Sequence, residues 1–255
     1  MKILLLNPNT TAEVTELLYA AGHRAASPGT ELVPMTAKRG VPYIATRAEA
    51  QIGGAIALEM LAEAGAGFDA AIIAAFGDPG LLGARELFSF PVVGLAEAAM
   101  LTACMLGQRF SIVTFSPTLA PWYDECVVMH GLETRCTGIR ALDESFQSIS
   151  DVQAEKEDAL VRLANLAVER DYADVVILSG APLAGLADKV KDRIPVPVID
   201  PVAAAVRQAE TLAVLKPLKA RAGTFRRPGP KPTTGLAEPL AAVIEHRDEK
   251  QGGTR

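Results

Sequence analysis

The sequence predicts an α/β protein built from two pseudo-symmetric lobes, with mainly parallel sheets and a cleft between the lobes. Two observations lead to this prediction. Short runs that are apolar throughout alternate with segments of helical spacing, which is typical of parallel strands covered by helices on both faces. The second half of the chain also repeats the order and spacing of the first half.

Strands and helices are expected to alternate along the whole chain. In the first half we expect strands at 2–7, 31–35, 69–75 and 91–95, and helices at 11–25, 46–65 and 80–88. In the second half we expect strands at 109–115, 134–142, 173–180 and 196–200, and helices at 96–106, 118–130, 151–170, 183–191 and 201–212. A basic, Pro-rich segment at 225–235 is expected to cross the surface before a short helix at 236–246.

Three segments support the internal repeat. KILLLNPNTT (2–11) matches RFSIVTFSPT (109–118), DAAIIAAFGDPGLLG (69–83) matches DVVILSGAPLAGLAD (174–188), and PVVG (91–94) matches PVID (197–200). The offsets of 107, 105 and 106 residues are nearly equal, which favours a duplicated unit over an accidental likeness between α/β segments. We therefore expect one lobe at 1–96 together with 201–255, and the other at 97–200.

Composition narrows the class of function. The chain has 255 residues and a net charge of −5, and it has no basic stripe that would indicate nucleic-acid binding. No apolar run is long enough for a membrane helix, and the N-terminus resembles a first strand more than a signal peptide. Three cysteines without a CxxC pair suit a reducing cytoplasm and give no zinc signature. We expect a cytoplasmic protein with a small-molecule substrate and no metal.

The candidate site lies at the carboxyl ends of the predicted strands, because parallel α/β sheets bind ligands at that edge. If the two lobes face each other there, Ala75 and Gly180 occupy equivalent strand ends. Backbone and side-chain donors in the nearby turns suit a carboxylate or imide oxygen. The expected substrate-binding residues are Asn7, Asn9, Thr10, Tyr43, Phe76, Gly77, Thr114, Ser116 and Ala181. Helix capping by Thr10 or Thr11 is the alternative role for the first turn.

Few side chains near these turns can move a proton. Asp78 is the one acid in the two central turns, and it either acts as a base or caps the helix near Pro79. Ser179 needs an adjacent base to act at neutral pH. Besides Tyr43, two aromatic residues, Trp122 and Tyr123, either cover the cleft from a loop or serve only in packing.

The remaining candidate side chains are expected to be structural. His23, His130 and His246 are scattered, and a surface or packing role is expected for each. We expect Cys104 to lie in the core. Cys126 and Cys136 are expected to lie away from the strand ends.

Four motifs resemble the aspartate/glutamate racemase superfamily, in particular its hydantoin and allantoin racemase branch. They are NPNTT (7–11), FGDPGL (76–81) followed by Ala84-Arg85-Glu86, PVVGLAEAA (91–99) and APLAGLA (181–187). The resemblance covers nearly the whole chain. It implies an enzyme without a cofactor that forms dimers or larger homo-oligomers. It also implies that one cysteine removes a proton from carbon and a second cysteine returns a proton from the opposite face.

The chain departs from this pattern at both cysteines, because the family positions fall on Ala75 and Gly180. Two-thiol racemisation is therefore not expected. Three functions stay open. The first is a diverged reaction such as ring opening, decarboxylation or a lyase step, in which water, Ser179 or Asp78 replaces the thiols. The others are a racemase or epimerase, with unrecognised bases or with substituted cysteines, and a small-molecule binding protein. Two replaced positions favour natural divergence over a single inactivating substitution.

Overall fold

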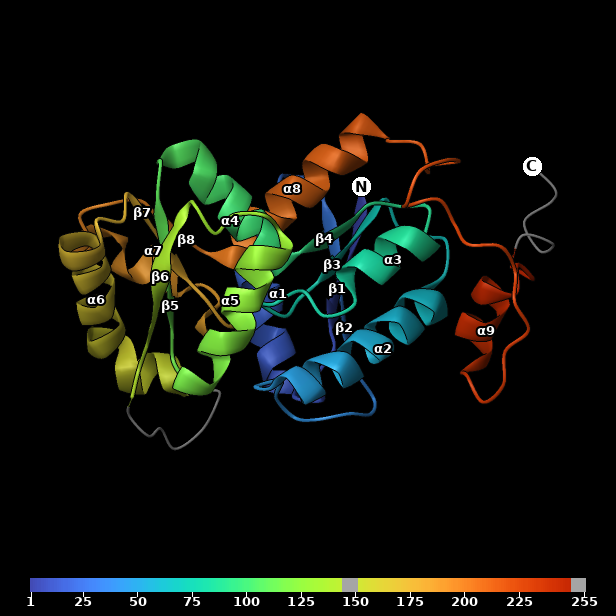
Figure 1. Ribbon diagram of the computed structural model, residues 1–255, viewed down its shortest axis with the longest axis horizontal. Coiled ribbons are helices and arrows are strands. Elements are labelled where there is room, and N and C mark those ends of the chain that lie inside the picture. The colour runs from blue at the N-terminus through green and yellow to red at the C-terminus, as the bar shows by residue number, and fades with distance from the viewer. Residues whose placement is uncertain (144–150, 249–255) are drawn as a thin grey trace.

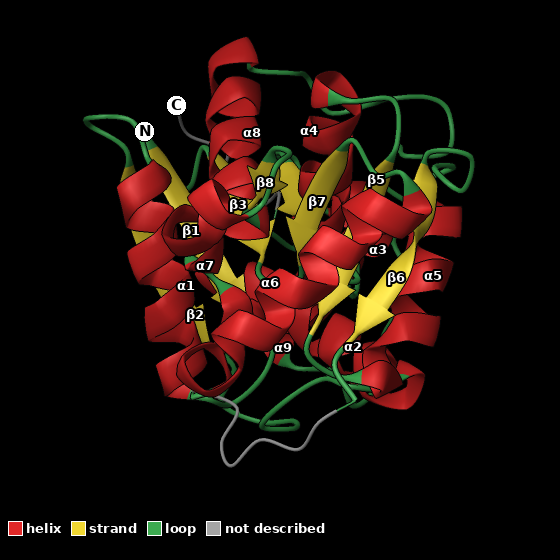
Figure 2. Ribbon diagram, turned by 90° about the vertical axis from the view of Figure 1, so that its left-hand side faces the viewer, coloured by secondary structure: helices red, strands yellow, loops and turns green. Residues whose placement is uncertain are grey.

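The described residues form two four-stranded parallel sheets flanked by helices (Figure 1, Figure 2). The computed structural model describes residues 1–143 and 151–248. The strand orders are β2-β1-β3-β4 and β6-β5-β7-β8, so the same order occurs once in each half. This confirms the predicted α/β class with two lobes.

The elements follow the expected sequence of strands and helices closely. The first half contains β1 (Lys2–Asn7), α1 (Ala12–Ala25), β2 (Glu31–Thr36), α2 (Arg47–Ala64), β3 (Ala70–Ile73), α3 (Leu81–Leu87) and β4 (Val92–Gly94). The second half contains α4 (Leu95–Leu106), β5 (Phe110–Thr114), α5 (Ala120–Met129), β6 (Cys136–Ala141), α6 (Val152–Asp171), β7 (Val175–Leu178), α7 (Leu186–Val190), β8 (Val198–Ile199) and α8 (Pro201–Leu215). After α8 the chain runs outside the first sheet to α9 (Glu238–Ile244), which packs on α2 (Figure 1).

Equivalent hydrogen bonds show that the repeat is structural. The amide of Ala74 donates to the carbonyl of Leu6 over 2.7 Å, and the amide of Ser179 donates to the carbonyl of Val113 over 2.8 Å. The carbonyls of Asn7 and Thr114 likewise each accept one amide over 3.0 Å from the neighbouring chain segment. Asn7 therefore corresponds to Thr114, and the residue after Ala74 corresponds to the residue after Ser179, as the sequence offsets predict.

The central strands are shorter than the apolar runs that predicted them. Strand β3 ends at Ile73 and β7 ends at Leu178, although the runs continue for about two residues. The chain leaves the sheet through Gly77 (φ +103°) in the first half and through Gly180 (φ +111°) in the second. Glycine is favoured at these angles because it has no Cβ.

The two lobes exchange a helix. Helix α4 follows the first sheet but packs on β7 and β8, whereas α8 follows the second sheet but packs on β3 and β4. The two helices also contact each other near the centre of the molecule (Figure 1). This exchange supports the lobe division that we propose, 1–96 with 201–255 and 97–200.

Candidate active site

The two positions at which the family resemblance predicts cysteines lie just beyond the central strands. Ala75 follows β3 and Gly180 follows β7, and both residues are buried. A methyl group and a hydrogen atom cannot accept or donate a proton at neutral pH. Any proton transfer at these strand ends must therefore use another group.

An aromatic ring fills the space at Gly180. A Cβ at this position would lie 2.5 Å from Cε1 of Phe115, and the backbone angle φ of +111° disfavours any side chain. Phe115 is fully buried, and its ring centroid lies 5.7 Å from that of Tyr43. The second half of the candidate site is thus packed with rings where a thiol would begin.

A helix of the second half covers the turn after β3. A Cβ at Gly77 would lie 2.4 Å from Cζ2 of Trp122, so the indole packs directly on the backbone. The ring of Phe76 makes an edge-to-face contact with Tyr123, with centroids 4.7 Å apart. Trp122 and Tyr123 lie on α5 and are buried. They reach the turn from a helix, and the loop position that we considered for them is wrong.

Tyr43 has a buried hydroxyl without a hydrogen-bond partner in the described part of the chain. Its loop, between β2 and α2, is tied to the first turn by two bonds. The amide of Thr10 donates to the carbonyl of Val41 over 3.0 Å, and the hydroxyl of Thr11 donates to the carbonyl of Pro42 over 2.6 Å. Burial raises the pKa of Tyr43 far above its usual value, so the side chain is a neutral phenol.

The first turn is organised by its two asparagines, which are both buried. The amide group of Asn7 donates to Oδ1 of Asn9 over 3.0 Å and to the hydroxyl of Thr15 over 2.9 Å. Oδ1 of Asn9 also accepts from the amide of Thr11 over 3.0 Å. Thr11 is the N-cap residue of α1, but its side chain makes no capping bond. The asparagines shape the turn, while neither threonine caps the helix with its side chain.

The hydroxyls of the second half are also engaged. Ser179 is fully buried and donates to the carbonyl of Val113 over 3.1 Å. Thr114 donates to the carbonyl of Ser179 over 3.3 Å. The hydroxyls of Ser116 and Thr118 lie 2.9 Å apart in the turn that follows β5. The hydroxyls of Ser179 and Thr114 thus both donate to backbone carbonyls, and these contacts place no base beside the Ser179 hydroxyl.

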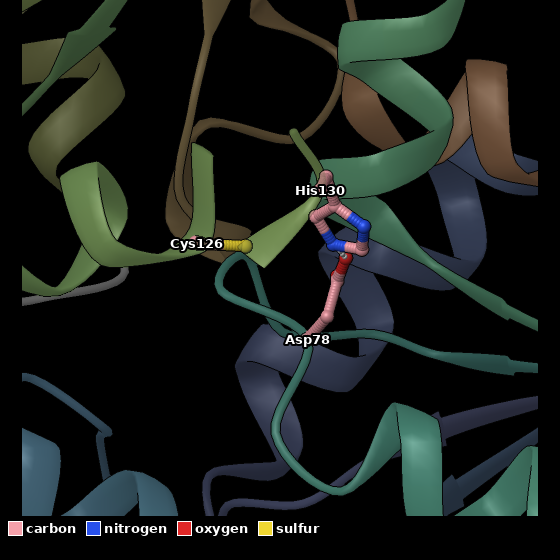
Figure 3. Close-up of side chains that lie close together, drawn as sticks. All are labelled: Asp78, Cys126 and His130. Carbon is pink, nitrogen blue, oxygen red and sulfur yellow. Dashed lines mark hydrogen bonds and ion pairs between the residues drawn. The ribbon is translucent and has the colours of Figure 1, made fainter. Parts of the chain in front are cut away.

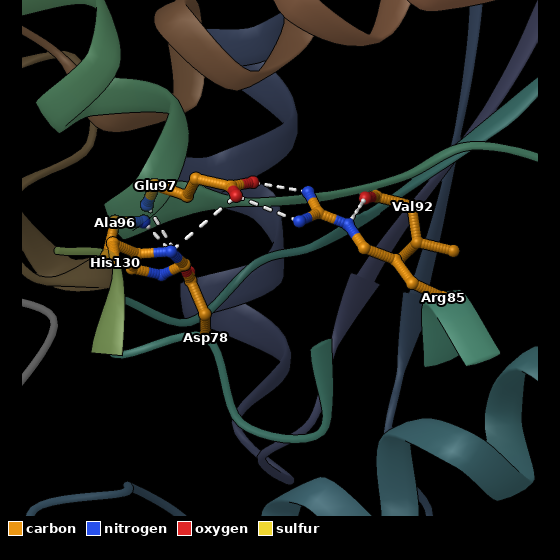
Figure 4. A network of polar contacts seen from close by, with 6 residues as sticks. All are labelled: Asp78, Arg85, Val92, Ala96, Glu97 and His130. Carbon is orange, nitrogen blue, oxygen red and sulfur yellow. Dashed lines mark hydrogen bonds and ion pairs between the residues drawn. The ribbon is translucent and has the colours of Figure 1, made fainter. Parts of the chain in front are cut away.

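Asp78 caps a helix, but it is not the helix expected from the sequence. Its carboxylate accepts the amides of Ala96 over 2.9 Å and of Glu97 over 2.8 Å, in the first turn of α4 (Figure 4). Helix α3, which follows Pro79, has no side-chain cap. Asp78 can reach the start of α4 because the N-cap residue there is a glycine: a Cβ at Gly94 would lie 2.2 Å from Cγ of Asp78. The carboxylate occupies the space that this glycine leaves empty.

A polar network extends from Asp78 (Figure 4). Nε2 of His130 lies 3.2 Å from Oδ2 of Asp78, and Nδ1 lies 3.6 Å from Oε1 of Glu97. Arg85 makes a two-pronged ion pair with Glu97 and donates through Nε to the carbonyl of Val92 over 2.9 Å. Burial raises the pKa of Glu97, but the hydrogen bonds and charge of Arg85 outweigh it, so the pKa falls below its usual value.

Sequence reasoning missed Cys126 and His130 as neighbours of this turn. Cys126 was expected away from the strand ends, which is wrong, because its Sγ lies within 4.8 Å of ligand atoms of Asp78 and His130 (Figure 3). Cys126 on α5 and His130, the C-cap residue of this helix, lie about one turn apart, and only the packing of α5 on the first half brings them to Asp78. Burial and the charges of Asp78 and Glu97 raise the pKa of the Cys126 thiol.

A cavity of about 550 Å³ borders the same turn. It is lined from both halves, by Arg47, Ala50, Gln51, Gly54, Ala55, Leu58, Gly77, Asp78, Pro79, Gly80, Trp122, Glu125, Cys126 and Met129. An exposed ion pair joins Arg47 on α2 to Glu125 on α5, with 2.5 Å between Nη2 and Oε1. The cavity therefore lies between α2, the turn after β3, and α5.

Comparison with known proteins places this geometry in a family. The model of the Asp/Glu/hydantoin racemase family matches residues 3–209. The chain belongs to this family. It is 34% identical over 242 residues to a hydantoin racemase of Pseudomonas sp. (strain NS671), covering 93% of this chain and 96% of that protein. A hydantoin racemase of Paenarthrobacter aurescens is 32% identical over 233 residues, covering 91% of this chain and 99% of that protein.

Solved structures agree with the family assignment. The allantoin racemase of Klebsiella pneumoniae superposes with a TM-score of 0.88 at 34% identity, covering 94% of this chain and 98% of that chain. The allantoin racemase of Pseudomonas fluorescens gives a TM-score of 0.86 at 34% identity, with coverages of 92% and 100%. Within residues 1–143 and 151–248, no helix is both long and apolar enough to cross a membrane.

Proposed function

We propose that this protein is a cofactor-independent enzyme of the racemase family that acts on a small imide, lactam or carboxylate carbon acid, by a reaction that does not use two thiols. The observation that carries the proposal is the pair of equivalent strand ends, Ala75 and Gly180, with no thiol at either position. Family membership and the racemases among its relatives support chemistry at a carbon next to a carbonyl group.

A reaction that breaks a carbon–carbon bond suits this site better than one that begins by breaking a carbon–hydrogen bond. Removing a proton from carbon requires a base near the substrate. In a decarboxylation, the bond to the carboxylate breaks, CO₂ leaves, and the electron pair stays on carbon as an enolate. That enolate then needs only a proton, which water can supply, so no thiolate is required.

Tyr43 is the proposed donor to the enolate oxygen. Its hydroxyl is buried and has no partner among the described residues, and the phenol is neutral because burial raises its pKa. A fixed donor in a site that excludes water stabilises developing negative charge more than the same donor in bulk solvent. The backbone amides of the glycine-containing turns would hold the remaining oxygens of the substrate.

The relatives favour a second candidate, racemisation of a hydantoin or a similar imide. This function requires a base in place of the family thiols. Asp78 is a weak candidate, because both carboxylate oxygens accept backbone amides and one of them also contacts His130. Binding of a small molecule without turnover is the third candidate, and the two assays described next separate it from the other two.

Two assays on the purified protein decide between these functions. Hydantoins, allantoin and amino acids are incubated in D₂O, and a panel of substituted malonates and lactams is assayed for turnover. We expect no inversion and no deuterium uptake in the first assay, and turnover in the second that falls in the Tyr43→Phe variant. Inversion at about 1–10³ per second would support a racemase instead. Ligand binding without turnover would support a binding protein.

We also propose that the protein works in the cytoplasm as a homo-oligomer. Its three cysteines are free thiols, which suits a reducing compartment. Exposed apolar side chains on the neighbouring helices α4 and α8 support association, namely Leu101, Met105, Leu106, Val214 and Leu215. Sedimentation analysis of the purified chain tests the second proposal, and a monomer at micromolar concentration would contradict it.

A further inference from the structure

Three side chains of different chemistry meet beside the turn after β3 (Figure 3). Asp78 comes from the first half of the chain, Cys126 comes from α5 in the second half, and His130 is the C-cap residue of that helix. Their ligand atoms all lie within 4.8 Å of one another, and Nε2 of His130 is 3.2 Å from Oδ2 of Asp78. No zinc signature is visible in the sequence, because these residues share no short motif and come from two distant segments.

We propose that Asp78, Cys126 and His130 form a binding site for a divalent cation of the zinc type. Carboxylate oxygen, thiolate sulfur and imidazole nitrogen are the ligands that zinc prefers. With metal–ligand bonds of about 2.0–2.3 Å in a tetrahedral arrangement, neighbouring ligand atoms lie roughly 3–4 Å apart. The contact of 3.2 Å between His130 and Asp78 already has this spacing.

Helix geometry places two of the ligands on one face. Cys126 and His130 are four residues apart at the end of α5, so their side chains project to the same side, one turn apart. Asp78 approaches from the opposite segment, on a turn fixed by its bonds to the amides of Ala96 and Glu97. Small rotations of side chains on rigid elements are therefore enough to close the site.

Both ring nitrogens of His130 face a carboxylate, so either one can carry the proton, Nδ1 when Nε2 is used as a ligand and Nε2 when it is used as a donor. Nδ1 lies 3.6 Å from Oε1 of Glu97, which is itself held by the two-pronged bond from Arg85. A proton on Nδ1 leaves the lone pair of Nε2 directed toward Asp78 and the cluster. A carboxylate behind the second nitrogen is the usual support for a metal-binding histidine.

Charge and valence balance in the proposed complex. The thiol of Cys126 loses one proton to solvent, a metal–sulfur bond forms, and His130 contributes its Nε2 lone pair. Asp78 has lone pairs left on Oδ2 beyond those that accept the amide of Glu97. One dication with one carboxylate and one thiolate is neutral, which suits a buried position.

The fourth position of the cation faces an available space. Asp78 and Cys126 both line the cavity of about 550 Å³ between α2 and α5. In a four-coordinate site, three protein ligands leave the fourth position to water or a small ligand. The cation would also join the β3–α3 turn of the first half to α5 of the second.

The site is tested on the full chain, first stripped with a chelator and then titrated with Co²⁺ and Zn²⁺. We expect one equivalent of Co²⁺ to give a thiolate-to-cobalt charge-transfer band and tetrahedral visible bands, which Zn²⁺ then removes. The Cys126→Ser variant should lose the charge-transfer band. His130→Gln should bind more weakly by at least the roughly 10–100-fold that follows from losing a partner outside the ligand shell. The matched controls Cys104→Ser and His23→Gln should bind as the unmodified protein does.

A measurement on the unmodified protein tests the site even if the variants fail to fold. Zinc X-ray absorption on the unmodified protein should show one sulfur at about 2.3 Å and nitrogen or oxygen ligands at about 2.0–2.1 Å. A shell of nitrogen and oxygen alone would overturn the proposal. So would the absence of stoichiometric Co²⁺ binding, or a charge-transfer band that survives in folded Cys126→Ser. The site uses neither Ala75 nor Gly180, so these outcomes do not depend on the proposed reaction.

Discussion

The helices α4 and α8 occupy equivalent places in the two halves, yet they are capped in different ways. At α8, the N-cap residue Asp200 accepts the amides of Val202 over 2.9 Å and Ala203 over 3.0 Å. At α4, the N-cap residue is Gly94, and the carboxylate comes instead from Asp78 in the turn after β3. Both helices begin with a carboxylate on the same two amides, the second and third of the first turn.

This difference shows that the helix end needs a carboxylate but does not fix its source. In the first half, the one acid of the central turn is used to join the turn to α4. In the second half, the corresponding turn contains no acid, and Asp200 does this from the helix itself while also accepting the amide of Gly185. The turn after β3 is thus a packing junction as well as the end of a candidate site.

The largest effect is expected from restoring the thiols at the two strand ends. Ala75→Cys alone should give deuterium exchange without inversion, because one base acts on one face. Adding Gly180→Cys with Phe115→Leu, which makes room for the second thiol, should raise hydantoin racemisation about 10²–10⁴-fold over the background rate. Chiral chromatography measures the rate. Serine at 75 and 180 with Phe115→Leu is the control, and equal racemisation by that control would contradict a role for thiols.

Exchanging the caps tests the comparison directly. Asp78→Gly keeps the positive φ of +52° but removes the carboxylate, and should lower the free energy of unfolding by about 2–4 kcal/mol. Adding Gly94→Asp reproduces the arrangement at α8 and should recover about 1–2 kcal/mol. Urea denaturation with a chelator present measures both. Gly94→Asp alone should destabilise, because its Cβ meets Asp78. No recovery in the double variant would show that the two caps are not equivalent.

Exchanging alanine and glycine at positions 75 and 180 should reveal that the two strand ends have different backbone conformations. Gly180→Ala should cost about 1–3 kcal/mol of stability, since φ is +111° and the new Cβ meets Phe115. Ala75→Gly should cost less than about 1 kcal/mol, mainly through backbone entropy. Thermal unfolding compares the two variants. Equal losses would mean that Phe115 moves away readily.

Substitution of Tyr43 should give the smallest effect, and it should change the kinetics without lowering the stability. Its loop follows β2, and the counterpart after β6 includes residues 144–150, which lie outside the described residues. Tyr43→Phe removes a buried hydroxyl that has no partner in the described structure, so stability should stay equal or rise by up to about 1 kcal/mol. Substrate affinity or kcat/KM should fall about 3- to 10-fold. Lower stability with unchanged kinetics would place the hydroxyl in packing alone.

Most of the fold could be predicted from local patterns. Continuous apolar runs and helical spacing gave the order of the elements, and the repeat offsets gave the match of Asn7 with Thr114. Strand ends were less predictable, because the runs continue past Ile73 and Leu178 into turns whose geometry depends on Gly77 and Gly180. Hydrophobicity alone does not indicate where a strand loses its last partner.

The candidate site was predictable only where it lies on the strand ends. The positions 75 and 180 came from motif resemblance and the repeat, whereas their surroundings depend on contacts between the halves. The ring of Phe115 against Gly180, and the pairing of Asp78 with α4, could not be read from local sequence. Cys126 and His130 had a weak signal, their spacing of one helical turn, but nothing in the sequence indicated that this face meets Asp78.

The exchange of α4 and α8 has a consequence for synthesis on the ribosome. The face of β3 and β4 that α8 covers is complete when Gly94 emerges, but its cover ends at Leu215. At about 5–20 residues per second, the roughly 120 intervening residues leave that apolar face open for some 6–24 seconds. The part of the first lobe that is made first therefore stays partly uncovered until the whole second lobe and α8 have been synthesised.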